Sequence, residues 1–298
     1  MITMENEIKH EIPQLLEKYK GINTEVYEIQ SVGGGCINDA YKVITGSGNW
    51  FLKINEPEFE GMFECEQQGL ELLRSTGEIF VPEPLGSGRF DNGKIFFLME
   101  FVEEAPKEPD YWKNFGRQLA RMHKYSNNKF GLDDDNFIGS LPQYNRFHET
   151  WTEFFINERI ERQVRWAVEN EIMDNTLASK IRDSYAEFEK IFPEEPPALL
   201  HGDLWGGNVM TGPEGQPCII DPAVYYGHRE VDLAFSQLFG SFPEDFYESY
   251  NKEWPLAPGF EKRKDVYNLY PALVHVNLFG GTYLSMVERF METVEKAV

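Results

Sequence analysis

Two aspartates and an asparagine in the last third of the chain have the residue types and spacing of a phosphoryl-transfer site. Asp203 lies on a Gly-rich turn, Asn208 follows five residues later, and Asp221 ends an apolar run thirteen residues further on. Amide and carboxylate oxygens are ligands that Mg²⁺ prefers, so Asn208 and Asp221 could hold this ion. Asp203 would then be free to accept a proton from a substrate hydroxyl. Taken alone, each of the three could instead serve only to form a turn.

A lysine and a glutamate that could bind nucleotide phosphates come earlier in the chain. Lys53 lies within a predicted apolar strand over residues 50–54, although lysines also occur on exposed edge strands. Glu66 shares one face of the next predicted helix with two leucines, which directs its side chain inward. An inward glutamate needs a cation, so we expect Lys53 and Glu66 to pair and to orient the phosphates of ATP.

Two backbone segments could also contact a nucleotide. Gly33, Gly34 and Gly35 precede a predicted strand, and their backbone N–H groups could approach phosphates. The same three glycines would also suit an ordinary hairpin turn. Glu100 and Val102 lie at the end of a predicted strand and could offer backbone hydrogen bonds to adenine.

Four further residues near the two aspartates have a functional and a structural interpretation. Trp205 could line a sugar pocket with its apolar ring, or it could pack in the core. His228 and Arg229 follow Asp221 and could contact the substrate. We expect Asp232 to be buried and to support either the loop that carries Asp203 or the helix that Asp232 opens.

Three arginines recur at every third position in an otherwise acidic chain. Arg159, Arg162 and Arg165 alternate with Glu158 and Glu161. On a regular helix this pattern predicts a solvated face of ion pairs. The alternative is that the arginines dock an anionic group of a substrate.

The order of predicted elements favours an α+β fold with two lobes. The first hundred residues contain short predicted strands and one main helix, which starts near Met62 and stops at Gly77. Residues 103–110 include two prolines and four acidic residues, which is typical of a linker. The remaining pattern is mostly helical. We therefore predict a nucleotide-binding lobe over 1–102 and a catalytic and substrate-binding lobe over 103–298.

Charge and cysteine content exclude several classes of partner. The 298 residues include 28 Lys and Arg against 50 Asp and Glu, a net charge of −22. Such a chain repels nucleic acids and anionic membranes, so we expect neither as a partner. The cysteines, Cys36, Cys65 and Cys218, have no disulfide or zinc spacing, which suits a reducing cytoplasm. The first residues lack a signal-peptide pattern, and the uncharged stretch 266–287 predicts buried helix.

Sequence motifs spread over most of the chain resemble those of a known family. The motifs are Gly-Gly-Gly-Cys-Ile-Asn-Asp-Ala-Tyr (33–41), Phe-Glu-Cys-Glu (63–66), Asp-Asn-Phe-Ile-Gly (135–139), His-Gly-Asp-Leu-Trp-Gly-Gly-Asn (201–208) and Ile-Asp-Pro-Ala-Val-Tyr-Tyr-Gly-His-Arg-Glu-Val-Asp-Leu-Ala (220–234). In these motifs the chain resembles the protein-kinase-like superfamily of aminoglycoside and choline phosphotransferases and, more narrowly, the fructosamine kinase (ketosamine-3-kinase) family. Gly206 departs from the family pattern, because many members have serine there.

This resemblance implies a bilobal protein-kinase-like fold and a specific reaction. ATP would phosphorylate the third-carbon hydroxyl of a ketoamine, a sugar joined to an amine, and the unstable product would release the sugar. Asp203 would position and deprotonate the hydroxyl, Asn208 and Asp221 would hold Mg²⁺, and Lys53 would contact the phosphates. An ordinary aspartate has a pKa near ~3.9 and is a weak base at neutral pH, so orientation would be its main role.

Two other functions remain open at this point. The first is a kinase of another hydroxylated small molecule, such as an aminoglycoside or choline. The second is a catalytically inactive kinase fold used for binding, although the presence of Lys53, Glu66, Asp203, Asn208 and Asp221 argues against it. The preferred sugar and the nature of the amine also stay open.

A possible redox switch lies in the glycine loop. Cys36 directly follows the three glycines. A disulfide between the Cys36 residues of two chains would alter ATP binding, whereas otherwise we expect a monomer. The alternative is that Cys36 is simply a small apolar residue of the loop.

Overall fold

The computed structural model describes residues 4–33 and 38–297. The predictions made for Gly34, Gly35 and Cys36 therefore lie outside the described residues. The other predicted site residues all lie within them.

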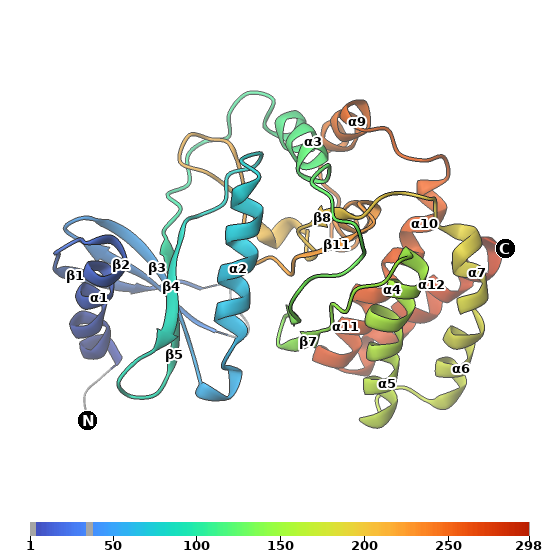
Figure 1. Cartoon of the computed structure of the whole chain (residues 1–298), viewed down its shortest axis with the longest axis horizontal. Helices are drawn as coiled ribbons and strands as arrows, with labels where there is room; N and C mark the ends of the chain where they lie inside the picture. Colours follow the sequence, from blue (N-terminus) through green and yellow to red (C-terminus); the bar gives the residue numbers. More distant parts are fainter. Residues whose placement is uncertain (1–3, 34–37, 298) are drawn as a thin grey trace.

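The N-terminal part is built on one antiparallel sheet (Figure 1). Its spatial order is β1-β2-β3-β5-β4, which places β3 in the centre with β2 and β5 as neighbours. Lys53 lies in the middle of β3, opposite Ala40 of β2 and Phe97 of β5. The strands are β1 (Val26–Ser31), β2 (Asp39–Thr45), β3 (Gly48–Asn55), β4 (Pro84–Arg89) and β5 (Ile95–Glu100).

Helices cover both faces of this sheet, and strand alternation decides which side chains meet which helix. α1 (Met4–Lys20) packs on the face that carries Leu52 and Ile54 of β3. A short 3-10 turn, η1 (Pro57–Phe59), then leads to α2 (Met62–Ser75), which packs on the other face. Because neighbouring strand residues point to opposite faces, Lys53 points toward α2, the helix that carries Glu66.

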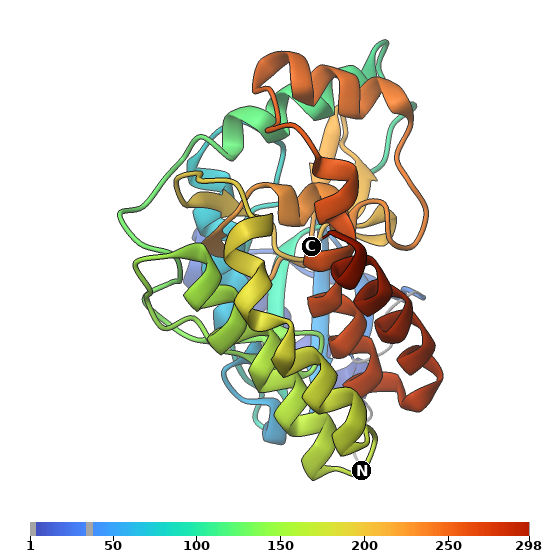
Figure 2. The ribbon, with the colours of Figure 1, turned by 90° about the vertical axis from the view of Figure 1, so that its right-hand side faces the viewer.

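The C-terminal part is mostly helical, with three two-stranded antiparallel pairs, β6–β7, β8–β11 and β9–β10. In Figure 1 most of its helices lie at the end of the molecule remote from the sheet, and Figure 2 views them from that end. Its elements are α3 (Tyr111–Met122), β6 (Asn136–Ile138), β7 (Leu141–Gln143), α4 (Trp151–Phe154), η2 (Phe155–Ile160), α5 (Glu161–Glu169), α6 (Asn175–Asp183), α7 (Tyr185–Ile191), β8 (Ala198–Leu200), η3 (Gly206–Asn208), β9 (Val209–Thr211), β10 (Pro217–Ile219), β11 (Tyr225–Gly227), α8 (Glu230–Phe235), α9 (Glu244–Glu253), α10 (Phe260–Tyr267), α11 (Leu269–Phe279), η4 (Gly281–Tyr283) and α12 (Leu284–Ala297).

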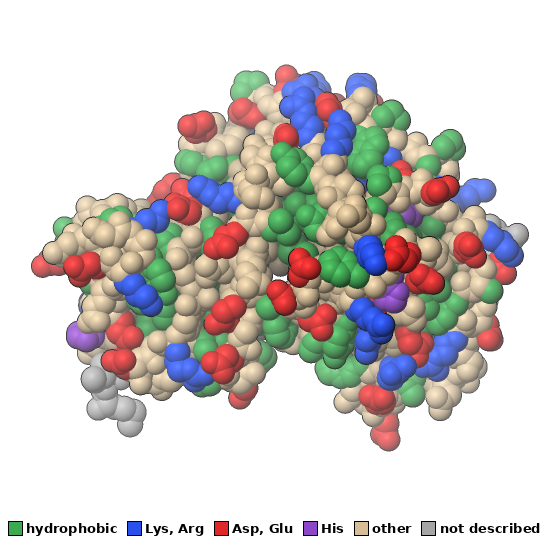
Figure 3. Space-filling view, viewed as in Figure 1, with side chains coloured by type: hydrophobic (Ala, Val, Ile, Leu, Met, Phe, Trp, Pro, Cys, Tyr) green, Lys and Arg blue, Asp and Glu red, His purple; other side chains and the backbone are tan. Residues whose placement is uncertain are grey.

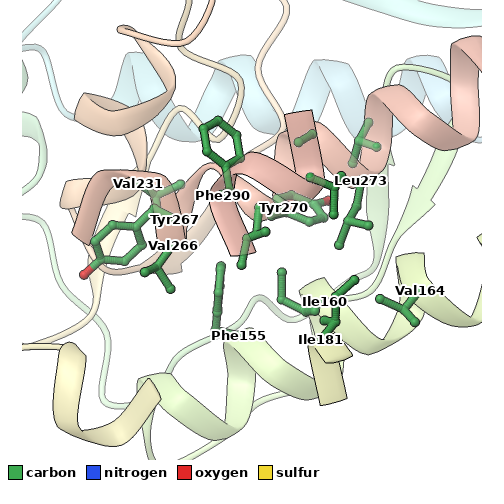
Figure 4. Close-up of a cluster of buried hydrophobic side chains, with 14 of the residues drawn as sticks. Phe155, Ile160, Val164, Ile181, Val231, Val266, Tyr267, Tyr270, Leu273 and Phe290 are labelled. Carbon is green, nitrogen blue, oxygen red and sulfur yellow. The ribbon is translucent and has the colours of Figure 1, made fainter. Parts of the chain in front are cut away.

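The largest hydrophobic cluster joins η2, α5 and α6 to α10, α11 and α12 (Figure 4). The apolar stretch 266–287 contributes to this cluster as parts of three helices, with a break at Gly280, whose φ is +89°. Within the described residues no helix is long and apolar enough to cross a membrane. The prediction of buried helix is confirmed for residues 266–274, whereas none of residues 277–286 is fully buried and Phe279 is 53% exposed.

A π-helical segment removes one of the three arginines from the predicted ion-paired face. Residues 155–160 form the π-helix η2, and a wider helical turn changes which side chains share a face. Arg159 is consequently fully buried, with its guanidinium 3.9 Å from the centre of the Tyr225 ring. Arg162 and Arg165 stay at the surface, and Arg162 pairs with Glu158 at 3.2 Å.

The two parts of the chain touch next to Asp221. The amide of Ile219 donates to the carbonyl of Phe80 at 3.1 Å, and α2 approaches Val224 so closely that a Cβ on Gly69 would lie 3.4 Å from it. Residues 103–110 connect β5 to α3 without helix or strand. A linker was predicted here, and the division into lobes at residue 102 stays a prediction.

Candidate functional site

Lys53 contacts two carboxylates, one from each part of the molecule. Its Nζ lies 2.7 Å from Oε1 of Glu66 and 2.6 Å from Oδ1 of Asp221. The predicted pair with Glu66 is present, and the contact with Asp221 is one that sequence reasoning missed. The side chains of Lys53 and Glu66 are 9% and 12% exposed, whereas that of Asp221 is 44% exposed. Figure 3 shows a hollow between the two parts, with acidic side chains around it.

This cluster holds one cation against two anions. Burial alone would lower the pKa of Lys53, but the charges of Asp221 and Glu66 outweigh it and raise that pKa. Burial raises the pKa of Glu66 to about 7, against the effect of Lys53. Burial also acts to raise the pKa of Asp221, but Lys53 outweighs this and lowers it. Lys53 and Asp221 are therefore charged at neutral pH, and Glu66 is the group that can take up a proton.

Asp203 and Asn208 meet at the turn that η3 forms. Nδ2 of Asn208 donates to Oδ2 of Asp203 at 2.8 Å and to its backbone carbonyl at 2.9 Å. Burial raises the pKa of Asp203 to about 7, although the hydrogen bond from Asn208 opposes this shift. The ordinary value near 3.9 that the sequence suggested is therefore too low for Asp203. A carboxylate with a pKa near neutrality is a better proton acceptor at physiological pH.

Asp232 is fully buried at the start of α8, beneath the loop that carries Asp203. Its Oδ2 accepts a hydrogen bond from the amide of His201 at 2.8 Å, and its Oδ1 accepts one from the amide of Gly202 at 2.9 Å. Oδ2 also lies 3.1 Å from Nε2 of His123. Both carboxylate oxygens are thus occupied in holding the backbone just before Asp203, as predicted.

His201 links the loops of the two aspartates. Its Nε2 lies 2.9 Å from the carbonyl of Ile220, and the amide of Asp203 donates to its Nδ1 at 3.2 Å. The proton therefore sits on Nε2, and burial lowers the pKa of His201, so that the ring stays neutral. With the proton on Nε2, both ring nitrogens of His201 are hydrogen-bonded, and the ring connects the loop of Asp203 to the residue before Asp221.

Asp221 has a strained backbone at the centre of the site. Its φ is +52°, which is uncommon for any residue except glycine, and Pro222 further restricts it. Gly202 permits the close approach of the neighbouring loop, because a Cβ there would lie 1.9 Å from the carbonyl oxygen of Ala223. The amide of Ala223 in turn donates to the carbonyl of His201 at 2.8 Å. The two loops therefore hold each other directly beside Asp221.

The two glycines after Trp205 differ in the space around them. A Cβ on Gly206 would meet no described heavy atom within 4 Å, so a serine fits at this departure from the family pattern. A Cβ on Gly207 would lie 2.3 Å from the Trp205 ring. Gly207 therefore lets the indole lie against the backbone of η3.

Trp205 starts an exposed row of aromatic rings next to Asp203. Its side chain is 38% exposed, and its ring centre lies 6.4 Å from that of Phe239. Phe239 packs on His275 at 4.6 Å, and His275 lies 5.4 Å from Phe279 and 5.2 Å from Tyr283. Sequence reasoning missed the other four rings of this row, of which Phe239 contacts Trp205. The sequence feature that could have revealed three of them is the spacing of the rings at positions 275, 279 and 283, which lie four residues apart.

The structure does not bring His228 and Arg229 to the site. His228 is 1% exposed, its Nδ1 lies 3.0 Å from the hydroxyl of Tyr267, and its ring stacks on Trp151. Arg229 is 2% exposed, and its guanidinium binds Glu195 at 2.7 Å together with two backbone carbonyls. Their donors are used inside the fold, which corrects the expectation that they contact a substrate.

The predicted backbone contacts to a nucleotide lie at the end of β5 and after β1. The amide of Glu100 donates to the carbonyl of Glu83 at 2.9 Å, while the amide of Val102 has no backbone acceptor among residues 4–33 and 38–297. A Cβ on Gly33 would meet no described heavy atom within 4 Å. Val102 therefore keeps a backbone donor available, and open space surrounds Gly33.

The residues around Asp221 fit a magnesium ion that a nucleotide brings. Within the described part of the chain, no group of three or more His, Cys, Asp or Glu side chains could hold a metal by itself. Mg²⁺ in phosphoryl-transfer sites is held by one or two protein oxygens together with phosphates and water. Asp221 and Asn208 offer this donor set, and Nδ2 of Asn208 lies 3.5 Å from the carbonyl of Asp221.

Comparison with known proteins gives matches over nearly the whole chain. The fructosamine kinase family model matches residues 8–297. A protein of Vibrio parahaemolyticus named probable ketoamine kinase is 40% identical over 268 residues, which cover 89% of this chain and 91% of that protein. The chloroplastic protein-ribulosamine 3-kinase of Arabidopsis thaliana is 40% identical over 272 residues, which cover 89% of this chain and 82% of that protein.

Solved structures agree with these matches. A crystal structure from Thermobifida fusca, assigned as a fructosamine-3-kinase, has a TM-score of 0.85 at 32% identity and covers 96% of this chain and 98% of that one. An aminoglycoside phosphotransferase in complex with AMP-PNP and hygromycin B has a TM-score of 0.63 at 14% identity, covering 96% of this chain and 97% of that one. The second similarity shows that the fold is that of kinase-like phosphotransferases, as predicted.

Proposed function

This chain belongs to the fructosamine kinase family, and from this membership we propose that it transfers a phosphoryl group from ATP to the third-carbon hydroxyl of a ketoamine. The observation that carries the proposal is the family match over residues 8–297. The phosphorylated ketoamine would then lose its sugar and leave the free amine, which amounts to deglycation. The geometry of the site suggests a role for each residue in this reaction.

Lys53 would bind the phosphates of ATP, and Glu66 would keep its ammonium group in place. In support, Lys53 contacts Glu66 at 2.7 Å and is almost completely buried, so its position is well defined. Kinase-type sites use such a lysine–glutamate pair to position phosphates. Adenine would bind to the backbone of Glu100 and Val102, and the N–H groups of the loop from Gly33 to Gly35 would approach the phosphates.

Asn208 and Asp221 would hold Mg²⁺. The ion, when bound, supplies positive charge to the phosphate oxygens on which negative charge develops. Asp221 contacts Lys53 at 2.6 Å, so lysine and ion would neutralise the same phosphates from adjacent positions. The donor set of one carboxylate and one amide supports this assignment.

Asp203 would orient the substrate hydroxyl and accept its proton. The pKa of this carboxyl, which burial raises to about 7, keeps a large fraction ionised at neutral pH and makes it a stronger base than an ordinary aspartate. Asn208 donates to one of its oxygens at 2.8 Å, which leaves the other oxygen for the hydroxyl. Asp232 would support this residue through the backbone of His201 and Gly202.

The row of rings that starts at Trp205 would bind the ketoamine. Rings such as those of Trp205 and Phe239 offer faces to the apolar side of a sugar, and they attract the protonated amine beside it. His275 has its Nδ1 2.8 Å from the carbonyl of Pro271, so that its Nε2 would accept a hydrogen bond from the substrate.

The wider assignments follow from the same picture. Residues 1–102 would form the nucleotide-binding lobe, and residues 103–298 would form the catalytic and substrate-binding lobe. A cytoplasmic location would suit the free thiols of Cys65 and Cys218. We expect a monomer, with a disulfide-linked dimer through Cys36 as the alternative under oxidation.

Turnover on a panel of acceptors tests the proposal. The purified chain is incubated with Mg²⁺ and ATP and with ribulose-lysine, fructose-lysine, an aminoglycoside or choline. Phosphorus NMR then locates the new ester. Phosphate on the third carbon of a ketoamine is the expected result, whereas turnover only on the aminoglycoside or choline would contradict the proposed substrate class.

A further inference from the structure

A buried amide cluster holds the backbone directly after Asp221. Nε2 of Gln143 donates to the carbonyl of Ala223 at 3.0 Å, and Nδ2 of Asn136 donates to the carbonyl of Val224 at 2.8 Å. Gln143 is 1% exposed and Asn136 is 7% exposed. These two side chains come from the β6–β7 hairpin, about eighty positions before the segment that they hold.

The amide of Gln143 is fixed by partners on all sides. Its Nε2 also donates to Oδ1 of Asn136 at 2.8 Å, and its Oε1 accepts a hydrogen bond from the hydroxyl of Tyr270 at 2.8 Å. Nδ2 of Asn145 donates to the same Oδ1 of Asn136 at 2.9 Å. The buried guanidinium of Arg159 donates to Oδ1 of Asn145 at 2.7 Å. A flip of the Gln143 amide would therefore break three hydrogen bonds at once.

The segment that this cluster holds begins two residues after Asp221, whose backbone is strained. Asp221 has a φ of +52° and precedes a proline, so the surrounding structure must impose this conformation. The loop of His201 and Gly202 holds Ala223 from one side, through the amide of Ala223. Gln143 holds the carbonyl of the same residue from the other side.

We infer that Gln143 is a positioning residue for Asp221, acting through the carbonyl of Ala223. The inference rests on the proposed function, in which Asp221 binds Mg²⁺. Gln143 keeps Asp221 in the left-handed conformation in which its carboxylate meets Lys53 and the metal. Groups that orient a metal ligand set its affinity, and their loss typically weakens metal binding by roughly 10–100-fold.

The test compares two variants that each lose a side-chain amide with two acceptors. Gln143→Met removes donors to one backbone carbonyl and one side-chain amide oxygen. Asn277→Leu is the matched control, because Nδ2 of Asn277 donates to the carbonyl and to Oε1 of Gln163, at 3.0 and 2.7 Å, between α11 and α5. Mn²⁺ binding in the presence of AMP-PNP is measured by EPR, and the Mg²⁺ concentration for half-maximal turnover is measured in parallel.

We expect Gln143→Met to bind Mn²⁺ about 10-fold more weakly, near the lower end of the usual range, and to need correspondingly more Mg²⁺ for turnover. Asn277→Leu should lose thermal stability but keep the metal affinity of the wild type. Tyr270→Phe, which frees only the acceptor of Gln143, should change metal binding in the same direction by a smaller factor. This variant also serves if Gln143→Met does not fold.

Two results would overturn the inference in distinguishable ways. If Gln143→Met and Tyr270→Phe both bind Mn²⁺ as tightly as the wild type, Gln143 has only a structural role and the proposed function stands. If the wild type with AMP-PNP binds no Mn²⁺ and its turnover needs no divalent cation, the assignment of Asp221 as a metal ligand fails as well.

Discussion

Lys53 and Arg263 are both buried cations that face glutamates, but their surroundings differ. Lys53 meets two carboxylates, Glu66 and Asp221, and the second of these is 44% exposed toward the space between the two parts of the chain. Arg263 binds both oxygens of one carboxylate, that of Glu230, at 2.8 and 2.6 Å. Glu230 is fully buried, and Arg263 is 6% exposed.

Two further donors of the arginine are also used. Arg263 donates to the carbonyls of Pro258 and Ala257 at 2.7 and 2.8 Å. Arg229 is arranged in the same way, with Glu195 and the carbonyls of two neighbouring residues as acceptors. The planar fork of arginine suits this pairing, because each donor has a fixed direction.

The difference separates groups that hold the fold from groups that can bind a ligand. In the arginine clusters each cation faces one carboxylate and two backbone carbonyls, and both arginines are almost completely buried. The cluster of Lys53 has an excess carboxylate in Asp221, which is partly exposed and is the group that we propose as a ligand of the cation that arrives with a nucleotide. The following predictions test this contrast, beginning with the largest effect.

Arg263→Met should unfold far more readily than the wild type. It leaves Glu230 buried without its cation, and breaking a buried pair in this way costs about 3–5 kcal/mol. The free energy of unfolding in urea measures this loss, and the KM for ATP of the folded variant should be that of the wild type. A loss below about 1 kcal/mol, the size of an exposed ion pair, would show that this cluster does not hold the fold.

Lys53→Met should lose mainly activity, whereas Arg263→Met should lose mainly stability. Loss of a donor that stabilises the transition state typically lowers the rate by roughly 10²–10³-fold, so kcat/KM for ATP should fall by this factor. Stability should fall less than in Arg263→Met, because Glu66, whose pKa burial raises to about 7, can take up a proton when the cation is absent. Steady-state kinetics and urea unfolding of the same preparation give both values. An unchanged kcat/KM for ATP would refute the role of Lys53.

Activity should depend on pH through Asp203. Because burial raises the pKa of this carboxyl to about 7, the fraction in the ionised form falls tenfold for each pH unit below that value. The proton acceptor is the ionised form, so kcat/KM for the ketoamine should decrease by about tenfold per unit as the pH falls below 7. Circular dichroism over the same range separates this effect from acid unfolding. A flat profile between pH 5 and pH 8 would contradict the role of Asp203 as a base.

Gly206→Ser should have almost no effect on thermal stability or on ketoamine kinetics. The position has open space around a Cβ, and substitutions of this kind usually change stability by less than about 0.5 kcal/mol. Gly207→Ser is the contrasting variant, because a Cβ there would push the Trp205 ring and raise the KM for the ketoamine. Thermal unfolding and ketoamine kinetics measure both variants. Equal kinetics for the two would remove Trp205 from the proposed substrate site.

The parts of the site that sequence reasoning predicted depend on local periodicity. Lys53 alternates with apolar residues of β3, and Glu66 shares a face of α2 with leucines, so their meeting follows from two short patterns. The role of Asp232 under the loop of Asp203 was likewise predicted from its position at the start of a helix. The α+β fold followed from the order of strands and helices.

The other features of the site could not be predicted, because they depend on how segments far apart in the sequence pack together. The contact between Lys53 and Asp221 spans 168 positions, and neither local pattern predicts it. His228 follows Asp221 closely in sequence, but it is directed into the aromatic core around Trp151. Arg159 was misplaced because a π-helical turn breaks the regular spacing of the arginines. The hydrogen bonds of Gln143 leave no pattern in the sequence at all.

Single-turnover phosphorylation by Asp203→Asn tests the central claim most directly. The variant keeps the shape of the side chain and removes its charge, so binding and chemistry can be separated. With ribulose-lysine and ATP in a rapid-quench experiment, we expect ATP affinity like that of the wild type and phosphoryl transfer slower by roughly 10²–10⁴-fold. Transfer at the wild-type rate with ATP bound equally well would contradict the assignment of Asp203, and with it the proposed organisation of the site.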